Sequence, residues 1–237
     1  MFSSTTRGVA AAAGLALATA SLAACSPSSS DHGLAVVATT TQICDYVTQI
    51  AAHSADISLD KTDAAGKSSH VGAQNDGAAL TMRLTCLLAP NASAHEHEMT
   101  PAQTSALAQA DVMAVSGVDL EHFLDDAVVS SGFKGRMVVT SGVLTAADID
   151  NPGTPDPEGA YTIDRGSERV DVAPWPFPPE EAGEEPEFRF DPHVWTSPKG
   201  ARVQVANLGA GLAAAAPDAA SSINAATASY LEDIDAL

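Results

Sequence analysis

Two histidine-bearing segments of this chain carry the residues most suited to chemistry. The first, His-Glu-His-Glu-Met-Thr-Pro, spans residues 95–101, and the second, Asp-Pro-His-Val-Trp, spans residues 191–195. Each sets a histidine just beyond the end of an expected strand, where α/β proteins expose ligand-binding groups. Neutral imidazole binds Zn²⁺ well, and it binds Mn²⁺ or Fe²⁺ when carboxylates complete the shell. We therefore take His95 and His193 as candidate ligands of a divalent transition metal.

Both segments also allow less specific interpretations. His95 and His97 point the same way in an extended segment, but an exposed polar loop without a site is the alternative for such a pair. Methionine at position 99 excludes the helical His-Glu-x-x-His arrangement of metalloproteases. Asp191 could orient the His193 ring by accepting from the ring nitrogen that does not bind the metal. Alternatively, His193 could be a core histidine hydrogen-bonded to that carboxylate or to a backbone carbonyl.

The elements that must position these histidines alternate between strand and helix patterns. Short apolar runs predict buried strands, and helical spacing after capping residues predicts the helices between them. The expected strands cover residues 34–40, 80–89, 111–116 and 136–140, and the expected helices begin at Thr41, Thr100, Asp119, Ser197 and Pro217. His122 falls on the third of these helices and is interpreted as a surface residue. This alternation predicts an α/β fold with a parallel sheet flanked by helices.

Two segments interrupt that pattern. Residues 54–79 are polar and rich in Gly, Ala and Ser, which predicts an excursion on the surface. Residues 151–190 are rich in proline and in acidic residues and contain no histidine. A segment of that length and composition is typical of a long exposed loop or an inserted lid rather than a core element.

The N-terminus has the pattern of a bacterial lipoprotein. Arg7 is followed by a run of apolar and small residues, which predicts a secretory signal over residues 1–24. Leu-Ala-Ala-Cys then fits the lipobox pattern and makes Cys25 the candidate lipidation site; an ordinary signal with a stray cysteine is the alternative. The serine-rich residues 25–33 would form a flexible tether, and acyl chains would hold the protein at the outer membrane face.

Charge and cysteine content narrow the partners and the compartment. The formal net charge of -19 at pH 7 makes nucleic acid a poor partner. Cys44 lies on an expected helix and Cys86 on an expected strand, two elements that usually pack together. In an oxidising compartment they could form a disulfide, and two separately buried thiols are the alternative.

Several segments, taken in chain order, resemble the metal-binding lipoproteins of ABC importers for zinc, manganese or iron. The matching segments are residues 38–43, 87–90, 95–101, 110–113, 117–121 and 191–195, and the last is the most specific. The resemblance covers residues 34–237 except for the two interruptions. It implies two α/β lobes joined by one long helix, with the metal between the lobes. Residues 34–216 would be the N-terminal lobe, and residues 217–237 would start the linking helix.

The same resemblance implies a function and a partial ligand set. His95 and His193 would be the first two ligands, and His97 would be an accessory candidate because the family commonly has an aromatic residue there. A Glu or His and an Asp would come from a second lobe beyond Leu237, so we expect a truncated chain with half of a site. The implied function is extracytoplasmic capture of a Zn, Mn or Fe ion and its delivery to an ABC permease, without catalysis.

Two other functions fit parts of the pattern. A metal-dependent hydrolase could use the His-x-His pair with Glu96 or Glu98 as the base. A surface adhesin, or another partner-binding lipoprotein, could use the acidic residues 151–190 as its contact surface.

Overall fold

The computed structural model describes residues 1, 33–74, 77–153, 155–156, 159–179 and 183–237. The chain divides into two units, Met1–Asp31 and His32–Leu237, and the fold described below is that of the second. The expected signal peptide and the lipidation candidate Cys25 lie outside the described residues. Among the helices that are described, none is both long enough and apolar enough to cross a membrane.

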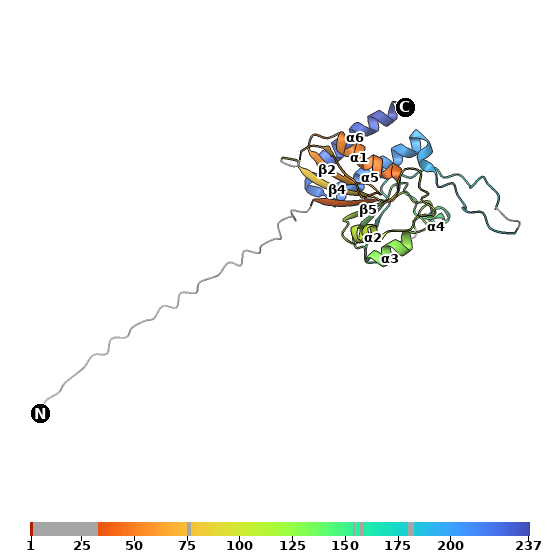
Figure 1. The fold of residues 1–237 in the computed structure, drawn as a ribbon, viewed down its shortest axis with the longest axis horizontal. Coiled ribbons are helices and arrows are strands. Elements are labelled where there is room, and N and C mark those ends of the chain that lie inside the picture. Colours follow the sequence, from red (N-terminus) through yellow and green to blue (C-terminus); the bar gives the residue numbers. More distant parts are fainter. Residues whose placement is uncertain (2–32, 75–76, 154, 157–158, 180–182) are drawn as a thin grey trace. The chain divides into compact units, whose positions relative to one another are not determined.

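One seven-stranded sheet organises the second unit (Figure 1). Its strands lie in the order β3-β2-β4-β1-β5-β6-β7, and every neighbouring pair is parallel except β2 with β3. The strands are β1 Leu34–Ala38, β2 Ile57–Thr62, β3 Ser68–Gly72, β4 Leu80–Cys86, β5 Val112–Val115, β6 Arg136–Val139 and β7 Thr162–Asp164. The α/β fold with a mostly parallel sheet, predicted from the alternation of elements, is confirmed.

Helices cover both faces of the sheet. The helices are α1 Thr41–Ala52, α2 Pro101–Ala108, α3 Leu124–Ser131, α4 Ala146–Asp150, α5 Pro198–Ala215 and α6 Ala220–Asp235, with short 3-10 turns at Val194–Thr196 and Pro217–Ala219. Apolar residues of α1, α5 and α6 share one buried cluster with β1, β2 and β4, whereas those of α2 and α3 share another with β5 and β6. Figure 1 shows α2 and α3 on the opposite side of the strands from α1 and α6.

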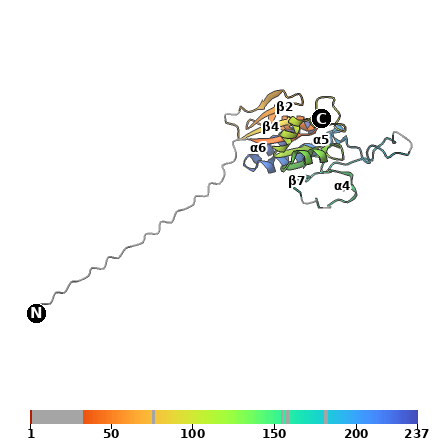
Figure 2. The ribbon, with the colours of Figure 1, turned by 60° about the horizontal axis from the view of Figure 1, so that its bottom comes forward.

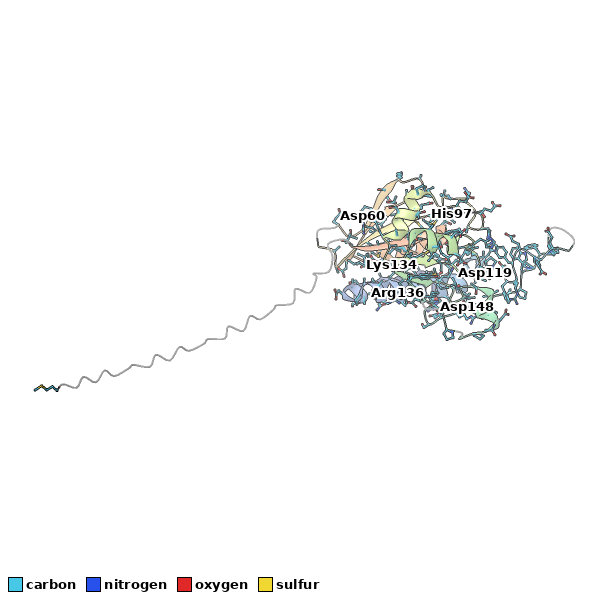
Figure 3. All side chains as sticks on the ribbon, turned by 90° about the horizontal axis from the view of Figure 1, so that it is seen from below. Asp60, His97, Asp119, Lys134, Arg136 and Asp148 are labelled. Carbon is cyan, nitrogen blue, oxygen red and sulfur yellow. A yellow bond between two sulfur atoms is a disulfide. The ribbon has the colours of Figure 1, made fainter. Side chains whose placement is uncertain are left out.

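The parallel strands end at the same edge of the sheet and bring the following loops together. The backbone N–H of Leu87 donates to Ala38, and that of Thr39 donates to Ala114, so the ends of β4, β1 and β5 are adjacent. In Figure 3, His97 and Asp119, which follow β4 and β5, lie to the right of Arg136, which starts β6. Ligand-binding groups of open α/β sheets gather at this carboxyl edge.

Both interrupting segments contribute strands, but only the prediction for residues 54–79 is corrected. Residues 54–79 were expected to be a surface excursion, but they contain β2 and β3; Ile57 and Leu59 are fully buried where β2 pairs with β4. The strand β2 was not predicted because it has only six residues. Its two buried apolar positions are too few to reveal a strand within a polar segment. Within residues 151–190, the three-residue strand β7 pairs with β6 and forms the edge of the sheet opposite to β3. Figure 2 shows β7 on the far side of the sheet from β2.

A disulfide fixes α1 to the carboxyl edge of the sheet. The sulfur atoms of Cys44 in α1 and Cys86 at the end of β4 are bonded, and both residues are buried. Of the two arrangements that the sequence left open, the structure therefore has the paired one. The bond joins the segment that follows β1 to the segment that leads toward His95.

A histidine clamp joins the end of α1 to α6. One ring nitrogen of His53 lies 2.8 Å from the carbonyl oxygen of Gln49, and the other lies 2.9 Å from a carboxylate oxygen of Asp233. The ring also lies 5.3 Å from that of Tyr230. Because both nitrogens face acceptors, the doubly protonated ring is favoured. The Gln49 carbonyl, followed by Asp233, raises the pKa of His53 above its ordinary value.

We expect this clamp to make part of the stability dependent on pH. With a folded-state pKa above that of the unfolded chain, the contribution is fully present below about pH 6.5 and is lost as pH rises through the folded-state pKa. The melting temperature of wild type should therefore exceed that of His53→Gln by more at about pH 5.5 than at about pH 8.5. Circular dichroism measures both melting temperatures. If wild type exceeds His53→Gln by the same amount at the two pH values, protonated His53 does not stabilise the fold.

Candidate metal centre

The first ligand loop connects β4 to α2 and is closed at both ends. Thr100 caps α2 by accepting from the backbone N–H of Gln103, whose side chain accepts in return from the Thr100 N–H. The same Gln103 side chain donates to the carbonyl oxygen of Leu87 at 2.7 Å. A buried glutamine thus ties the start of α2 to the end of β4. The loop that carries His95 and His97 is therefore held both at the end of β4 and at the start of α2.

The second ligand segment is held by a carboxylate and by the 3-10 turn that precedes α5. Both the backbone N–H and the ring Nδ1 of His193 lie within hydrogen-bonding distance of Asp191 Oδ1, at 3.0 and 2.8 Å. The His193 carbonyl oxygen accepts from the hydroxyl of Thr196 at 2.7 Å. A carboxylate on Nδ1 fixes the tautomer that leaves the Nε2 lone pair for a metal ion. The Asp191 side chain therefore orients the His193 ring as a ligand requires.

The two candidate ligands lie side by side although about a hundred residues separate them in sequence. The ring centroids of His95 and His193 are 5.6 Å apart, with an angle of 71° between the rings. A pocket at this place is lined by both histidines, by Leu120 and Trp195, and by residues 40–42 at the start of α1. This spacing allows one ion with metal–nitrogen distances of about 2.0–2.1 Å to contact both rings.

The environment of His95 favours a neutral ring. Its Nδ1 atom is buried, and it has no hydrogen-bond partner among the described residues. Burial lowers the pKa of His95, and the neighbouring His193 and His122 lower it further, against the opposing effect of the Glu187 carboxylate. A neutral imidazole with an unpartnered nitrogen is the form that a metal ion needs.

The remaining histidines of the region have different surroundings. The ring of His97 packs edge-on against Phe123, with centroids 4.9 Å apart, and burial lowers the pKa of His97. His122 is exposed, as expected, but it precedes α3 instead of lying on it, and its ring is 5.9 Å from that of His95. Within the described part of the chain, no three His, Cys, Asp or Glu side chains are placed to hold one metal ion.

Sequence reasoning missed three residues at this site: His122, Trp175 and Phe188. The rings of Phe188 and Trp175 pack against His95 and His193 respectively. The available signal for His122 was its position shortly after an expected strand, at the same edge of the sheet. No comparable signal exists for the two aromatic residues, because they lie in a segment without a regular hydrophobic period.

The family model described as zinc-uptake complex component A, periplasmic, matches residues 77–237. The chain belongs to this zinc-uptake component A family. The matched residues include both candidate ligands, His95 and His193, and the strands β4 to β7.

Solved structures show the same fold at low sequence identity. Zn(II)-bound AdcA from Streptococcus pneumoniae aligns with a TM-score of 0.53 at 17% identity, over 86% of this chain and 31% of that one. A zinc-bound deletion mutant of ZnuA gives 0.54 at 15%, over 86% and 55%. The metal-dependent lipoprotein YcdH from Bacillus subtilis gives 0.50 at 18%, over 85% and 52%. This chain therefore spans a third to about half of the length of these proteins.

Proposed function

We propose that this chain captures a divalent transition-metal ion, with zinc preferred, outside the cytoplasm and delivers it to an ABC permease. The observation that carries the proposal is the pairing of His95 with His193 at the carboxyl edge of the sheet, 5.6 Å between ring centroids. Membership of the zinc-uptake family supports the choice of ion. The printed descriptions of AdcA and ZnuA, both zinc-bound, support it as well.

The chemistry of the pair favours zinc over manganese. Zn²⁺ accepts nitrogen ligands readily, whereas Mn²⁺ prefers carboxylate, carbonyl and water oxygens. The carboxylate nearest to His193, that of Asp191, is engaged with the ring nitrogen and the backbone of that residue. We expect the two imidazoles to be the ligands that this lobe contributes, with the ion carried as cargo and not consumed.

The proposed location rests on the N-terminal sequence. A signal peptide over residues 1–24 and an acylated Cys25 would place the lobe on the outer face of a membrane, next to the permease. A tether of serine-rich residues allows the lobe to reach both the solution and the transporter.

Zinc binding by the full chain tests the proposal. Equilibrium dialysis of the double variant His95→Ala/His193→Ala should show binding at least about 100-fold weaker than wild type, because both nitrogen ligands are lost. Wild type should also bind Zn²⁺ more tightly than Mn²⁺. The matched control is His70→Ala, since His70 lies on β3 and is bonded to Asp60 and Ala73 instead. Equal zinc binding by wild type and the double variant would refute the site.

A further inference from the structure

Two parts of the segment between β7 and α5 are paired next to the histidines. The backbone N–H of Trp175 donates to the carbonyl oxygen of Arg189 at 3.0 Å, and that of Asp191 donates to Ala173 at 2.8 Å. An antiparallel bridge joins Pro174 to Phe190 between these bonds. The pairing fixes residues 173–175 against residues 189–191, and it runs directly into the segment that carries His193.

This pairing closes a cycle of four rings. His95 and His193 are 5.6 Å apart, His193 and Trp175 are stacked at 5.9 Å, Trp175 and Phe188 are 5.0 Å apart, and Phe188 and His95 are 4.9 Å apart. Phe188 also contacts His122, at 5.4 Å between centroids. We call Trp175 and Phe188 the aromatic cover, because together they close the cycle opposite the two imidazoles.

Phe188 is buried where its ring meets those of His95, His122 and Trp175. It is only 4% exposed, although Glu187 and Arg189 on either side are exposed. Neither of the two described apolar clusters that flank the sheet includes it. Phe177, in the same segment, is 61% exposed. Burial of Phe188 therefore goes with its contacts to these rings and is not a general property of the segment.

The aromatic cover packs against the two imidazoles without offering an ion any ligand. A zinc ion on two imidazoles needs further ligands, from water or from protein, to complete its usual four. Carbon rings supply none of these ligands. The Phe188 ring lies against His95 at a centroid distance of 4.9 Å, close enough to obstruct ligands that approach from that side.

We infer that the aromatic cover is displaceable and slows metal binding, so that an ion completes its coordination at His95 once the Phe188 ring has moved away. This inference rests on the proposed function and adds to it a residue that determines the rate of capture. The fraction of molecules with the ring displaced limits both the association rate and the apparent affinity. Phe188 packs against three neighbouring rings, and loss of such contacts corresponds to a change of about tenfold in the population with the ring displaced.

Association kinetics of zinc with the full chain test the inference. The two tryptophans of the chain, Trp175 and Trp195, have rings 5.9 and 5.3 Å from that of His193, so their emission reports binding there. In stopped-flow mixing with Zn²⁺, Phe188→Ala should associate about tenfold faster than wild type. The control Val129→Ala, at an exposed apolar residue of α3, should associate at the wild-type rate. Equal rates for wild type and Phe188→Ala would overturn the inference.

A second measurement needs no metal and separates the two proposals. Diethyl pyrocarbonate acylates neutral imidazole, and mass spectrometry of the peptides follows each histidine. In the metal-free wild type, His95 should react more slowly than the exposed His122, and Phe188→Ala should speed the reaction of His95 about tenfold. If wild type binds no zinc, the proposed function fails. If His95 is acylated equally fast in wild type and in Phe188→Ala, the inference about the aromatic cover fails, whatever the result for zinc. Phe188→Leu, which keeps an apolar side chain, gives an intermediate rate and replaces the alanine variant if that variant does not fold.

Discussion

Replacing Cys44 and Cys86 together by serine is expected to lower the free energy of unfolding by about 4 kcal/mol. The disulfide closes a loop with a sequence separation of 42 residues. Such a cross-link removes conformational entropy from the unfolded chain, by about 4 kcal/mol for a loop of this length. Both cysteines are buried, so the serine hydroxyls also lack the solvent that they would have at the surface. The melting temperature should fall by about 8–16 °C.

The matched comparison for this variant is the wild-type protein with its disulfide reduced. Reduction removes the cross-link but introduces no hydroxyl groups, so the two forms separate the entropic effect from the effect of buried serine. We expect reduced wild type to melt close to the double variant and well below oxidised wild type, as followed by calorimetry. If reduction leaves the melting temperature unchanged, the bond does not stabilise the fold.

The disulfide also bears on the metal centre, because of the elements that it joins. Cys44 is in the first turn of α1, directly after the pocket residues 40–42, and Cys86 precedes the loop that carries His95. Loss of the bond should therefore loosen two walls of the pocket together. We expect zinc affinity to fall less than it does when a ligand is removed, since Gln103 still closes the loop to Leu87.

The regular part of the fold could be predicted from local sequence patterns. The strand at β1 and the helices at α2 and α5 begin where an apolar run or a capping residue places them; Thr100 and Ser197 both act as N-caps. These signals are local, because a cap and a hydrophobic period depend on neighbours in sequence. The resemblance to metal-binding lipoproteins identified the family, which the family model confirms. The ligand roles of His95 and His193 stay a prediction.

The parts that were missed depend on contacts that are distant in sequence. The strand β2 is short, and Asp60, Lys61 and Thr62 make its second half polar; its assignment depends on pairing with β4 and β3. The burial of Phe188 depends on two histidines at positions 95 and 122 that approach it only in the folded chain. No window of neighbouring residues contains that information.

The start of α3 is another such case, and a buried carboxylate explains it. The sequence predicted a helix from Asp119, but Gly117, Val118 and Asp119 all have positive φ angles and α3 starts at Leu124. A β-branched residue such as Val118 rarely adopts this conformation. The side chain of Glu121 holds the turn by accepting from the backbone N–H groups of Ser116 and Gly117 at 2.7 and 3.0 Å. Helical geometry would separate these partners.

Replacing Glu121 by alanine is expected to destabilise the protein by about 3 kcal/mol, because two buried N–H groups lose their acceptor and the hydroxyl of Thr39 keeps only the Ala114 carbonyl oxygen. Burial raises the pKa of Glu121, and the hydrogen bonds from Thr39, Ser116 and Gly117 act in the opposite direction. Glu121→Gln keeps one acceptor oxygen and removes the charge, so its loss should be smaller. Glu98→Ala, at an exposed glutamate, is the matched control and should change stability by less than about 0.5 kcal/mol.

The position of this turn extends the prediction from stability to the site. Leu120 lines the pocket beside His95 and His193, and His122 contacts both His95 and Phe188. A turn released from Glu121 should move these side chains, so Glu121→Ala should bind zinc more weakly than wild type even at a temperature where both are folded. Urea unfolding and zinc dialysis on the same samples measure the two effects. If stability falls while zinc affinity stays at the wild-type value, the turn supports the fold without positioning the metal centre.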